Sequence, residues 1–442
     1  MRFVLDCFLH AVKKDRYIFQ KKHIMLLMHG VNKKNGELYL DDTSLSDLAI
    51  SFGTPSYIYS ASQIKDNFLE YKDSMRMNDK VCFAVKSNSN IAILKLLNSL
   101  GSGFDVVSGN ELKRCLVAGA DSKNIVFSGV GKTKEEIRLA VENNIFSINI
   151  ESESELERII KVVEEVGRKV DCAIRVNPDI SAESHPYITT GLKTSKFGVT
   201  SQVALTMSKR IQEIKNINLI GLACHIGSQI TKPELILDSL DHLIELANKI
   251  NKESNSIKFI DIGGGLGITY KDEDSANAKD IMTRVLNKIK TLNFDLVVEP
   301  GRSITGNAGV LLSQVEYIKE TEASNFAIVD AGMNDLMRPS LYSAWHNISA
   351  VKDLDVLEKE YEIVGPVCES ADSLAKNRKL KIEEGSVIAI HDVGAYGSTM
   401  ASNYNTRLRP PEIMVDGSDV RLIKRRETFE ELISFEDSAD EN

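Results

Sequence analysis

Lys86 is the first residue whose type and position suggest chemistry. It follows the apolar run 81–85 and precedes the helix-capping run 87–90. A lysine held in partly apolar surroundings has a depressed pKa, and its free amine can form a Schiff base with an aldehyde. Taken alone, Lys86 fits better as a strand-end lysine whose ammonium group reaches solvent.

Two further motifs offer a phosphate site and a carboxylate. Glycines occupy 263–265 after an apolar run, and backbone amides free of side chains can cradle a phosphate, although a tight structural turn is the alternative. A dinucleotide fingerprint is excluded because Ile268 stands at its third glycine position. Further on, Glu299 adds a carboxylate and Arg302 a guanidinium that could bind phosphate or carboxylate. With Lys86, this chemistry suits pyridoxal phosphate, whose pyridine nitrogen needs an acidic partner.

His225 and Ser228 form another motif, just after an apolar run. A lone histidine is usually structural. A histidine at the C-terminal end of a strand in a (β/α)8 barrel, with a hydroxyl three residues further on, is instead placed where such barrels bind their ligands.

Two clusters follow in the last third of the chain. Cys368 and Glu369 place a thiol and a carboxylate side by side in a turn-rich context. Arg338 lies four residues from Tyr342, a pair suited to binding a substrate carboxylate. Either cluster, taken alone, could equally be ordinary protein surface.

Bringing these residues together requires a scaffold, and the sequence predicts a (β/α)8 barrel of the α/β class. Eight short β-rich runs alternate with amphipathic helical stretches. The runs are 81–85, 104–107, 125–127, 146–150, 172–176, 219–224, 257–262 and 294–298. In such a barrel the reacting groups lie at the C-terminal ends of the strands, where Lys86, Asp105, Arg175, His225 and Glu299 fall. A doubly wound sheet is the weaker alternative, since no switch point is evident.

The barrel is predicted to span 60–305, and a β-rich barrel or sandwich domain to follow over 306–425. Strand-like runs in 30–59 are expected to join that second domain. Residues 1–29 form an extension of unknown role, and 426–442 an acidic helix or tail. The long gap between the fifth and sixth strands, which contains 185–187 and 191–198, is expected to be an active-site lid or specificity segment.

Composition narrows the class of protein. The 442 residues carry 54 Lys plus Arg against 63 Asp plus Glu, and the net charge of −9 argues against a nucleic-acid partner. The six cysteines form no CxxC pair, which disfavours a metal site and indicates a reducing, cytoplasmic location. No apolar run approaches the ~18 residues that a membrane span needs.

The chain resembles the fold-type III pyridoxal-phosphate decarboxylases over about residues 30–425, because six motifs occur in that family's order. They are Ala84-Val85-Lys86-Ser87-Asn88, His225-Ile226-Gly227-Ser228-Gln229, Gly263-Gly264-Gly265, Glu299-Pro300-Gly301-Arg302, Cys368-Glu369-Ser370 and Gly394-Ala395-Tyr396-Gly397. Within the family, the chain is most similar to enzymes that decarboxylate a diamino dicarboxylic acid in amino-acid biosynthesis. The resemblance therefore implies pyridoxal 5′-phosphate as cofactor.

The resemblance also implies a role for each site residue. Lys86 would carry the cofactor, His225 would stack on its ring and Glu299 would pair with the pyridine nitrogen. Asp105 and Arg175 would support the ring. The remaining cofactor-binding positions are Gly227, Ser228, Gly263, Gly264, Gly265, Pro300, Gly301, Arg302 and Tyr396.

On the substrate side, Arg302, Arg338 and Tyr342 would bind the far carboxylate and Glu369 the far ammonium, with Tyr396 nearby. Cys368 would donate a proton after carbon dioxide leaves. In this family the loop at 368–369 comes from the partner subunit, so the resemblance implies a homodimer with two shared active sites.

Three alternatives remain open. An ornithine, arginine or carboxynorspermidine decarboxylase of the same fold acts on a substrate without a far carboxylate, which leaves Arg338 and Tyr342 without a ligand. An alanine-racemase-like enzyme conflicts with the acidic Glu299.

The third alternative is a non-catalytic protein. A cofactor-carrying regulator of this kind would resemble the barrel alone, whereas this chain also has the β-rich region with Cys368, Glu369 and Tyr396. An inhibitory or scaffolding homologue would be expected to lack Lys86 or Cys368, and both are present.

Overall fold

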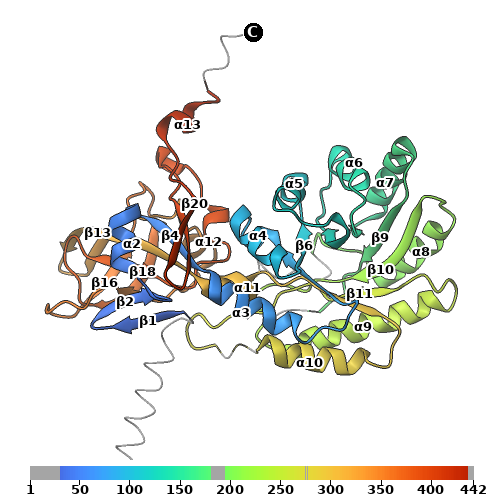
Figure 1. The fold of residues 1–442 in the computed structure, drawn as a ribbon, viewed down its shortest axis with the longest axis horizontal. Coiled ribbons are helices and arrows are strands. Elements are labelled where there is room, and N and C mark those ends of the chain that lie inside the picture. The colour runs from blue at the N-terminus through green and yellow to red at the C-terminus, as the bar shows by residue number, and fades with distance from the viewer. Residues whose placement is uncertain (1–29, 181–194, 274, 276, 437–442) are drawn as a thin grey trace, which may run out of the picture.

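The computed structural model describes residues 30–180, 195–273, 275 and 277–436. Its larger unit, on the right of Figure 1, is a closed barrel of eight parallel strands. Each strand pairs with the next, and β12 pairs back with β5. The strands are β5 (Lys80–Ala84), β6 (Gly103–Val106), β7 (Ile125–Phe127), β8 (Ser147–Ile150), β9 (Val170–Arg175), β10 (Ile217–Ala223), β11 (Phe259–Asp261) and β12 (Asp295–Val298). The predicted barrel is confirmed.

Helices surround the barrel and return the chain between strands. They are α4 (Ile91–Ser99), α5 (Gly109–Val117), α6 (Lys134–Glu142), α7 (Glu153–Val166), α8 (Ser201–Gln212), α9 (Pro233–Asn251) and α10 (Ala278–Ile289), with a 3-10 turn η2 (Ser122–Asn124) before β7. Capping fixes where they start: at the first turn of α6 the Thr133 hydroxyl accepts from the Glu136 amide, and the Glu136 carboxylate accepts from the Thr133 amide. Because every strand is followed by a crossover, all eight C-terminal strand ends meet at one end of the barrel.

The eighth barrel position differs from the simple alternation. After β12 the chain forms only α11 (Arg302–Thr305) and the 3-10 turn η4 (Gly306–Ala308). The longer helix α3 (Ala61–Lys72), which precedes the first barrel strand, packs there instead (Figure 1). Its Asn67 side chain donates to the Ile304 carbonyl at 2.8 Å, and the Tyr71 hydroxyl lies 2.8 Å from that of Ser303. A segment from before the barrel thus covers its last strand.

The second unit is a β-rich domain, as predicted. Its main sheet runs β17-β16-β14-β13-β4-β19-β20, and β18 joins β13 to β15. The strands are β4 (Ser56–Ser60), β13 (Gly309–Glu320), β14 (Asn325–Val329), β15 (Ile348–Ala350), β16 (Lys359–Val364), β17 (Ser373–Leu380), β18 (Val387–Ile390), β19 (Glu412–Asp416) and β20 (Asp419–Lys424). The other elements are α12 (Arg338–Tyr342), η5 (Ser398–Met400), η6 (Tyr404–Thr406) and α13 (Phe429–Ile433).

The segment before the barrel is divided between two sheets. β4 pairs with β13 and β19 inside the large sheet. A small sheet of β1 (Val31–Lys34), β2 (Glu37–Leu40) and β3 (Thr43–Ser44), followed by α2 (Leu45–Phe52), joins the domain through a 2.8 Å bond from the Leu38 amide to the Val351 carbonyl. The division into 30–59, 60–305, 306–425 and 426–442 remains a prediction.

Several predicted segments lie outside the described residues: 1–29, 437–442 and most of the expected lid, 185–187 and 191–194. In the part that is described, no helix combines the length and apolar character needed to cross a membrane.

Candidate active site at the C-terminal end of the barrel

Lys86 lies in the 3-10 turn η1 (Val85–Ser87), which continues directly from β5. Its Nζ donates to Asp105 Oδ2 at 2.7 Å; the lysine side chain is 35% exposed and Asp105 is fully buried in β6. Burial lowers the pKa of Lys86, but Asp105, then Tyr396 and Glu299, raise it, and the net shift is upward. The depressed pKa expected from an apolar setting is therefore wrong, because Asp105 holds the ammonium form.

Two carboxyl groups face each other at the ends of β11 and β12. Glu299 is hydrogen-bonded to Asp261 and accepts from the Ser128 hydroxyl at 3.4 Å, and Asp261 accepts from the Gly263 amide at 2.8 Å. Burial first, then Asp105 and Asp261, hold the pKa of Glu299 well above its ordinary value, and burial raises that of Asp261 to about 6. The pair therefore retains a proton near neutral pH.

The glycine loop after β11 packs against its neighbours through bare backbone. A Cβ on Gly264 would lie 2.0 Å from the Glu299 carbonyl oxygen, and one on Gly265 2.3 Å from that of Gly227. The Gly264 amide donates to His225 Nδ1 at 3.2 Å. Burial, then the charge of Lys86, keep the pKa of His225 well below its ordinary range, so its ring is neutral.

Pro300 and Gly301, which follow β12, pack against β5 and the turn η1 that carries Lys86. The Ala84 amide donates to the Pro300 carbonyl at 3.0 Å, and a Cβ on Gly301 would lie 3.0 Å from the Ser87 hydroxyl oxygen. Further along, the Tyr396 amide donates to the Ser87 carbonyl at 2.8 Å, so residues from both units meet beside Lys86.

Two buried arginines converge on one tyrosine. Arg302 donates to the Tyr270 hydroxyl at 2.7 Å and to the Ser228 hydroxyl at 3.0 Å, and its guanidinium lies 4.9 Å from the Tyr396 ring centroid. The Arg338 guanidinium lies 4.6 Å from the Tyr270 ring centroid. Arg302 and Arg338 are 7% and 5% exposed. Within the described residues, neither forms an ion pair with a carboxylate.

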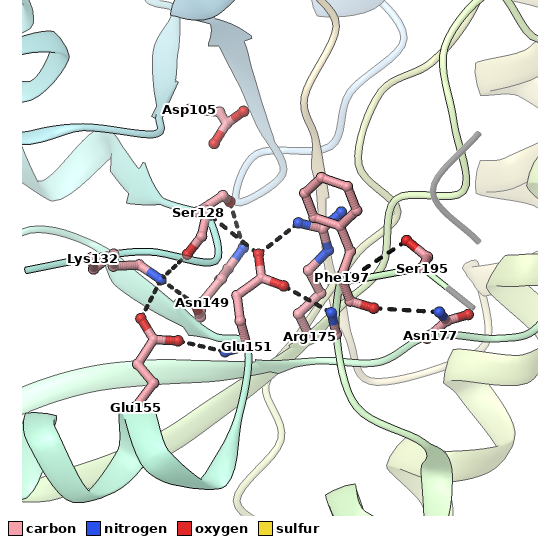
Figure 2. Close-up of polar contacts among 12 residues, drawn as sticks. Asp105, Ser128, Lys132, Asn149, Glu151, Glu155, Arg175, Asn177, Ser195 and Phe197 are labelled. Carbon is pink, nitrogen blue, oxygen red and sulfur yellow. Dashed lines mark hydrogen bonds and ion pairs between the residues drawn. The ribbon is translucent and has the colours of Figure 1, made fainter. Parts of the chain in front are cut away.

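Arg175 belongs to a polar network with side chains that follow the neighbouring barrel strands (Figure 2). It donates to Glu151 Oε1 at 2.6 Å, and its guanidinium lies 4.7 Å from the Phe197 ring centroid. The network also contains a buried ion pair in which Lys132 Nζ lies 2.7 Å from Glu155 Oε1, and Asn149 donates to Ser128 at 3.1 Å. Since Ser128 contacts Glu299, this network reaches the central carboxyl pair.

Cys368 and Glu369 lie on the loop between β16 and β17. Both residues are exposed, and the Cys368 amide donates to the Asn405 side chain at 2.8 Å. Tyr342, at the end of α12, acts electrostatically on Arg302. The structure thus gathers the predicted cofactor residues, Arg338 and Tyr342, while the thiol and its neighbouring carboxylate remain on the protein surface.

Sequence reasoning missed three members of this cluster. Tyr270 and His346 touch Arg338, and Lys132 supports the loop that carries Ser128. None stands in a recognisable motif. Only the position of Lys132 shortly after the third barrel strand offered a signal.

The residues present fit pyridoxal phosphate. Lys86 supplies a partly exposed amine, the Asp261 and Glu299 pair supplies a proton for a pyridine nitrogen, and Arg302 supplies a buried cation. In the described part of the chain, Asp105 Oδ1 is buried without a hydrogen-bond partner, an acceptor still available to a ligand.

Comparisons with known proteins agree with this chemistry. Residues 61–306 match the family described as "Pyridoxal-dependent decarboxylase, pyridoxal binding domain". The chain is 46% identical to diaminopimelate decarboxylase from Pseudomonas aeruginosa over 404 residues, 91% of this chain and 97% of that protein. Its fold matches diaminopimelate decarboxylase from Helicobacter pylori complexed with L-lysine, with a TM-score of 0.86, 40% identity and coverage of 89% and 99%. The enzyme from Methanocaldococcus jannaschii in co-complex with L-lysine gives a TM-score of 0.88, 39% identity and coverage of 93% and 98%.

The fold and the site therefore define a pyridoxal-phosphate-dependent decarboxylase built on a (β/α)8 barrel. Within that class, the chain belongs to the diaminopimelate decarboxylase family. Its cofactor is pyridoxal 5′-phosphate.

Proposed function

We propose that this protein decarboxylates meso-2,6-diaminopimelate to L-lysine and carbon dioxide, the last step of lysine biosynthesis. The observation that carries the proposal is the pair Arg302 and Arg338, which are buried near Lys86 and form no ion pair with a carboxylate among the described residues. Uncompensated buried cations are costly, and the far carboxylate of this substrate would compensate them. L-Lysine, the product, retains that carboxylate, and the two related structures named above contain it.

Bound pyridoxal phosphate supplies an electron sink for the electron pair left on the substrate carbon when carbon dioxide departs. Lys86 would hold the cofactor, Glu299 would hold the proton at the pyridine nitrogen, and neutral His225 would pack on the ring. The glycine loop, Ser228, Arg302 and Tyr396 would surround the phosphate. Cys368 Sγ would deliver the proton that replaces the lost carboxylate.

We further propose a cytoplasmic homodimer with two shared sites. Cys368 and Glu369 are exposed on a loop that bonds to its own domain, which leaves them available to a second copy of the chain. Glu369 would then bind the far ammonium of the substrate opposite Arg338. The net charge of −9 supports a small-molecule substrate rather than a nucleic acid.

Carbon dioxide release tests the reaction. Purified protein with pyridoxal phosphate is offered meso-diaminopimelate, ornithine and arginine in parallel, with Lys86→Ala as the inactive control. We expect release from diaminopimelate alone, with L-lysine as product. Release only from ornithine or arginine would overturn the role of Arg338, and release from none would favour a non-catalytic homologue.

Subunit mixing tests the shared site. Lys86→Ala and Cys368→Ala proteins are each inactive in this proposal, but a heterodimer would contain one intact site. We expect mixing to restore part of the activity. Absence of recovery, once subunit exchange has been demonstrated, would place the whole site within one chain.

A further inference from the structure

His346 is a fully buried histidine whose hydrogen bonds define its tautomer. Its Nδ1 lies 2.8 Å from the His391 carbonyl oxygen, and its Nε2 lies 3.0 Å from Arg338 NH1. A carbonyl can only accept and a guanidinium can only donate. Nδ1 therefore carries the hydrogen, and Nε2 presents a lone pair to Arg338.

The backbone around His346 is held on both sides. β15 begins two residues later and pairs with β18, and the His391 amide donates to the Asn347 carbonyl at 2.9 Å. On the other side, Arg378 stacks 4.5 Å from the Trp345 ring centroid and donates to the His346 carbonyl at 3.0 Å. The lone pair of Nε2 is consequently fixed in space.

Arg338, by contrast, has a long side chain with several rotamers and needs external contacts to hold one. His346 engages NH1, and the ring of Tyr270 covers one face of the guanidinium. Arg338 Nε is buried without a hydrogen-bond partner among the described residues. The edge of a guanidinium opposite NH1, formed by Nε and NH2, is one that can bind a carboxylate through two hydrogen bonds.

We propose that His346 is a positioning residue, which holds Arg338 so that its Nε edge binds the far carboxylate of the substrate. This inference rests on the proposed function. A neutral acceptor suits the task, because it orients the guanidinium without neutralising it. A carboxylate at the same position would pair with Arg338 and compete with the substrate.

The test compares two ligands that differ only in that carboxylate, L-lysine and 1,5-diaminopentane. Their dissociation constants are measured with the cofactor-loaded enzyme from the change in visible absorbance. For His346→Leu we expect L-lysine to bind about 10- to 100-fold more weakly, the loss typical of a hydrogen bond to a charged group, while diaminopentane binding is unchanged. His346→Gln, whose amide oxygen can accept from NH1, should restore most of the affinity.

Two further variants separate positioning from a purely structural role. In an Arg338→Gln background, His346→Leu should cause no additional loss of L-lysine affinity, since the group it orients is gone. His391→Leu is the matched control: this histidine is equally buried, but its side chain contacts the Ser349 hydroxyl at 2.5 Å. It should lower thermal stability without changing the preference for L-lysine over diaminopentane. If His346→Leu does not fold, His346→Glu provides the test, because its anion should weaken L-lysine binding selectively.

The outcomes are distinguishable. If the wild-type enzyme does not prefer L-lysine to diaminopentane, both the proposed function and this inference are overturned. If the wild type shows the preference and neither His346→Leu nor His346→Glu reduces it, only the role of His346 is overturned.

Discussion

Replacing Lys132 by methionine should destabilise the barrel strongly. The Lys132 side chain is 1% exposed, and its Nζ donates to Glu155 at 2.7 Å and to the carbonyls of Gly129 and Asn149 at 2.7 and 2.8 Å (Figure 2). Methionine fills similar space but carries no donor. The variant therefore leaves a buried carboxylate without its cation and two carbonyls without their donor.

The expected loss in the free energy of unfolding is about 3–5 kcal/mol, the range for breaking one side of a buried ion pair. Adding Glu155→Gln to the Lys132→Met variant should restore about 1–2 kcal/mol of the lost free energy of unfolding. The second substitution removes the uncompensated charge, and the amide oxygen of the new glutamine would still accept from the Glu151 amide as the Glu155 carboxylate does. Lys134→Met is the matched control. The Lys134 side chain forms an ion pair with Glu165 but is 49% exposed, so this substitution should lower the free energy of unfolding by less than about 1 kcal/mol.

Urea denaturation followed by far-ultraviolet circular dichroism, at one fixed pyridoxal phosphate concentration, measures these differences. A Lys132→Met protein whose free energy of unfolding lies within about 1 kcal/mol of the wild-type value would refute the reasoning. So would a double variant less stable than the single one.

Three other perturbations have defined outcomes. Gly264→Ala should abolish cofactor binding, measured by visible absorbance, because its Cβ would lie 2.0 Å from the Glu299 carbonyl; retained absorbance would contradict the packing. Asp392→Asn should stabilise the protein by up to about 4 kcal/mol at pH 8 and by little at pH 4. Asparagine also tolerates the positive φ of 59° at this position, so the substitution should not strain the backbone. Burial raises the pKa of Asp392 from 3.8 to about 7, so the folded state binds the extra proton and its stability falls as pH rises between those values; a pH-independent difference in thermal denaturation would contradict this. Lys86→Ala should remove the visible absorbance of the bound cofactor, and an unchanged spectrum would contradict its assignment.

The barrel could be predicted because its strands are buried on both faces and so form continuous apolar runs that stand out between amphipathic helices. The run at 125–127 matches β7, and the others differ from the observed strands by a few residues at their ends. The helix that covers the eighth barrel strand could not be predicted in the same way. Nothing local shows that α3, from before the barrel, covers it, since that depends on contacts between segments more than 200 residues apart, such as Asn67 with Ile304.

Within the site, residues that stand in motifs could be predicted and those that act through distant contacts could not. Lys86 was identified, but its raised pKa depends on Asp105, which only the pairing of β5 with β6 brings within 2.7 Å. Tyr270 and His346 come from segments 76 residues apart and meet at Arg338. Isolated aromatic residues of this kind carry no spacing signal.

The most direct test of the substrate assignment is an experimental structure of the cofactor-loaded protein with L-lysine. We expect the L-lysine carboxylate within hydrogen-bond distance of Arg302 and of the Nε edge of Arg338. A carboxylate bound elsewhere, with both arginines left without an anion, would contradict the proposal that they select a substrate with a second carboxylate.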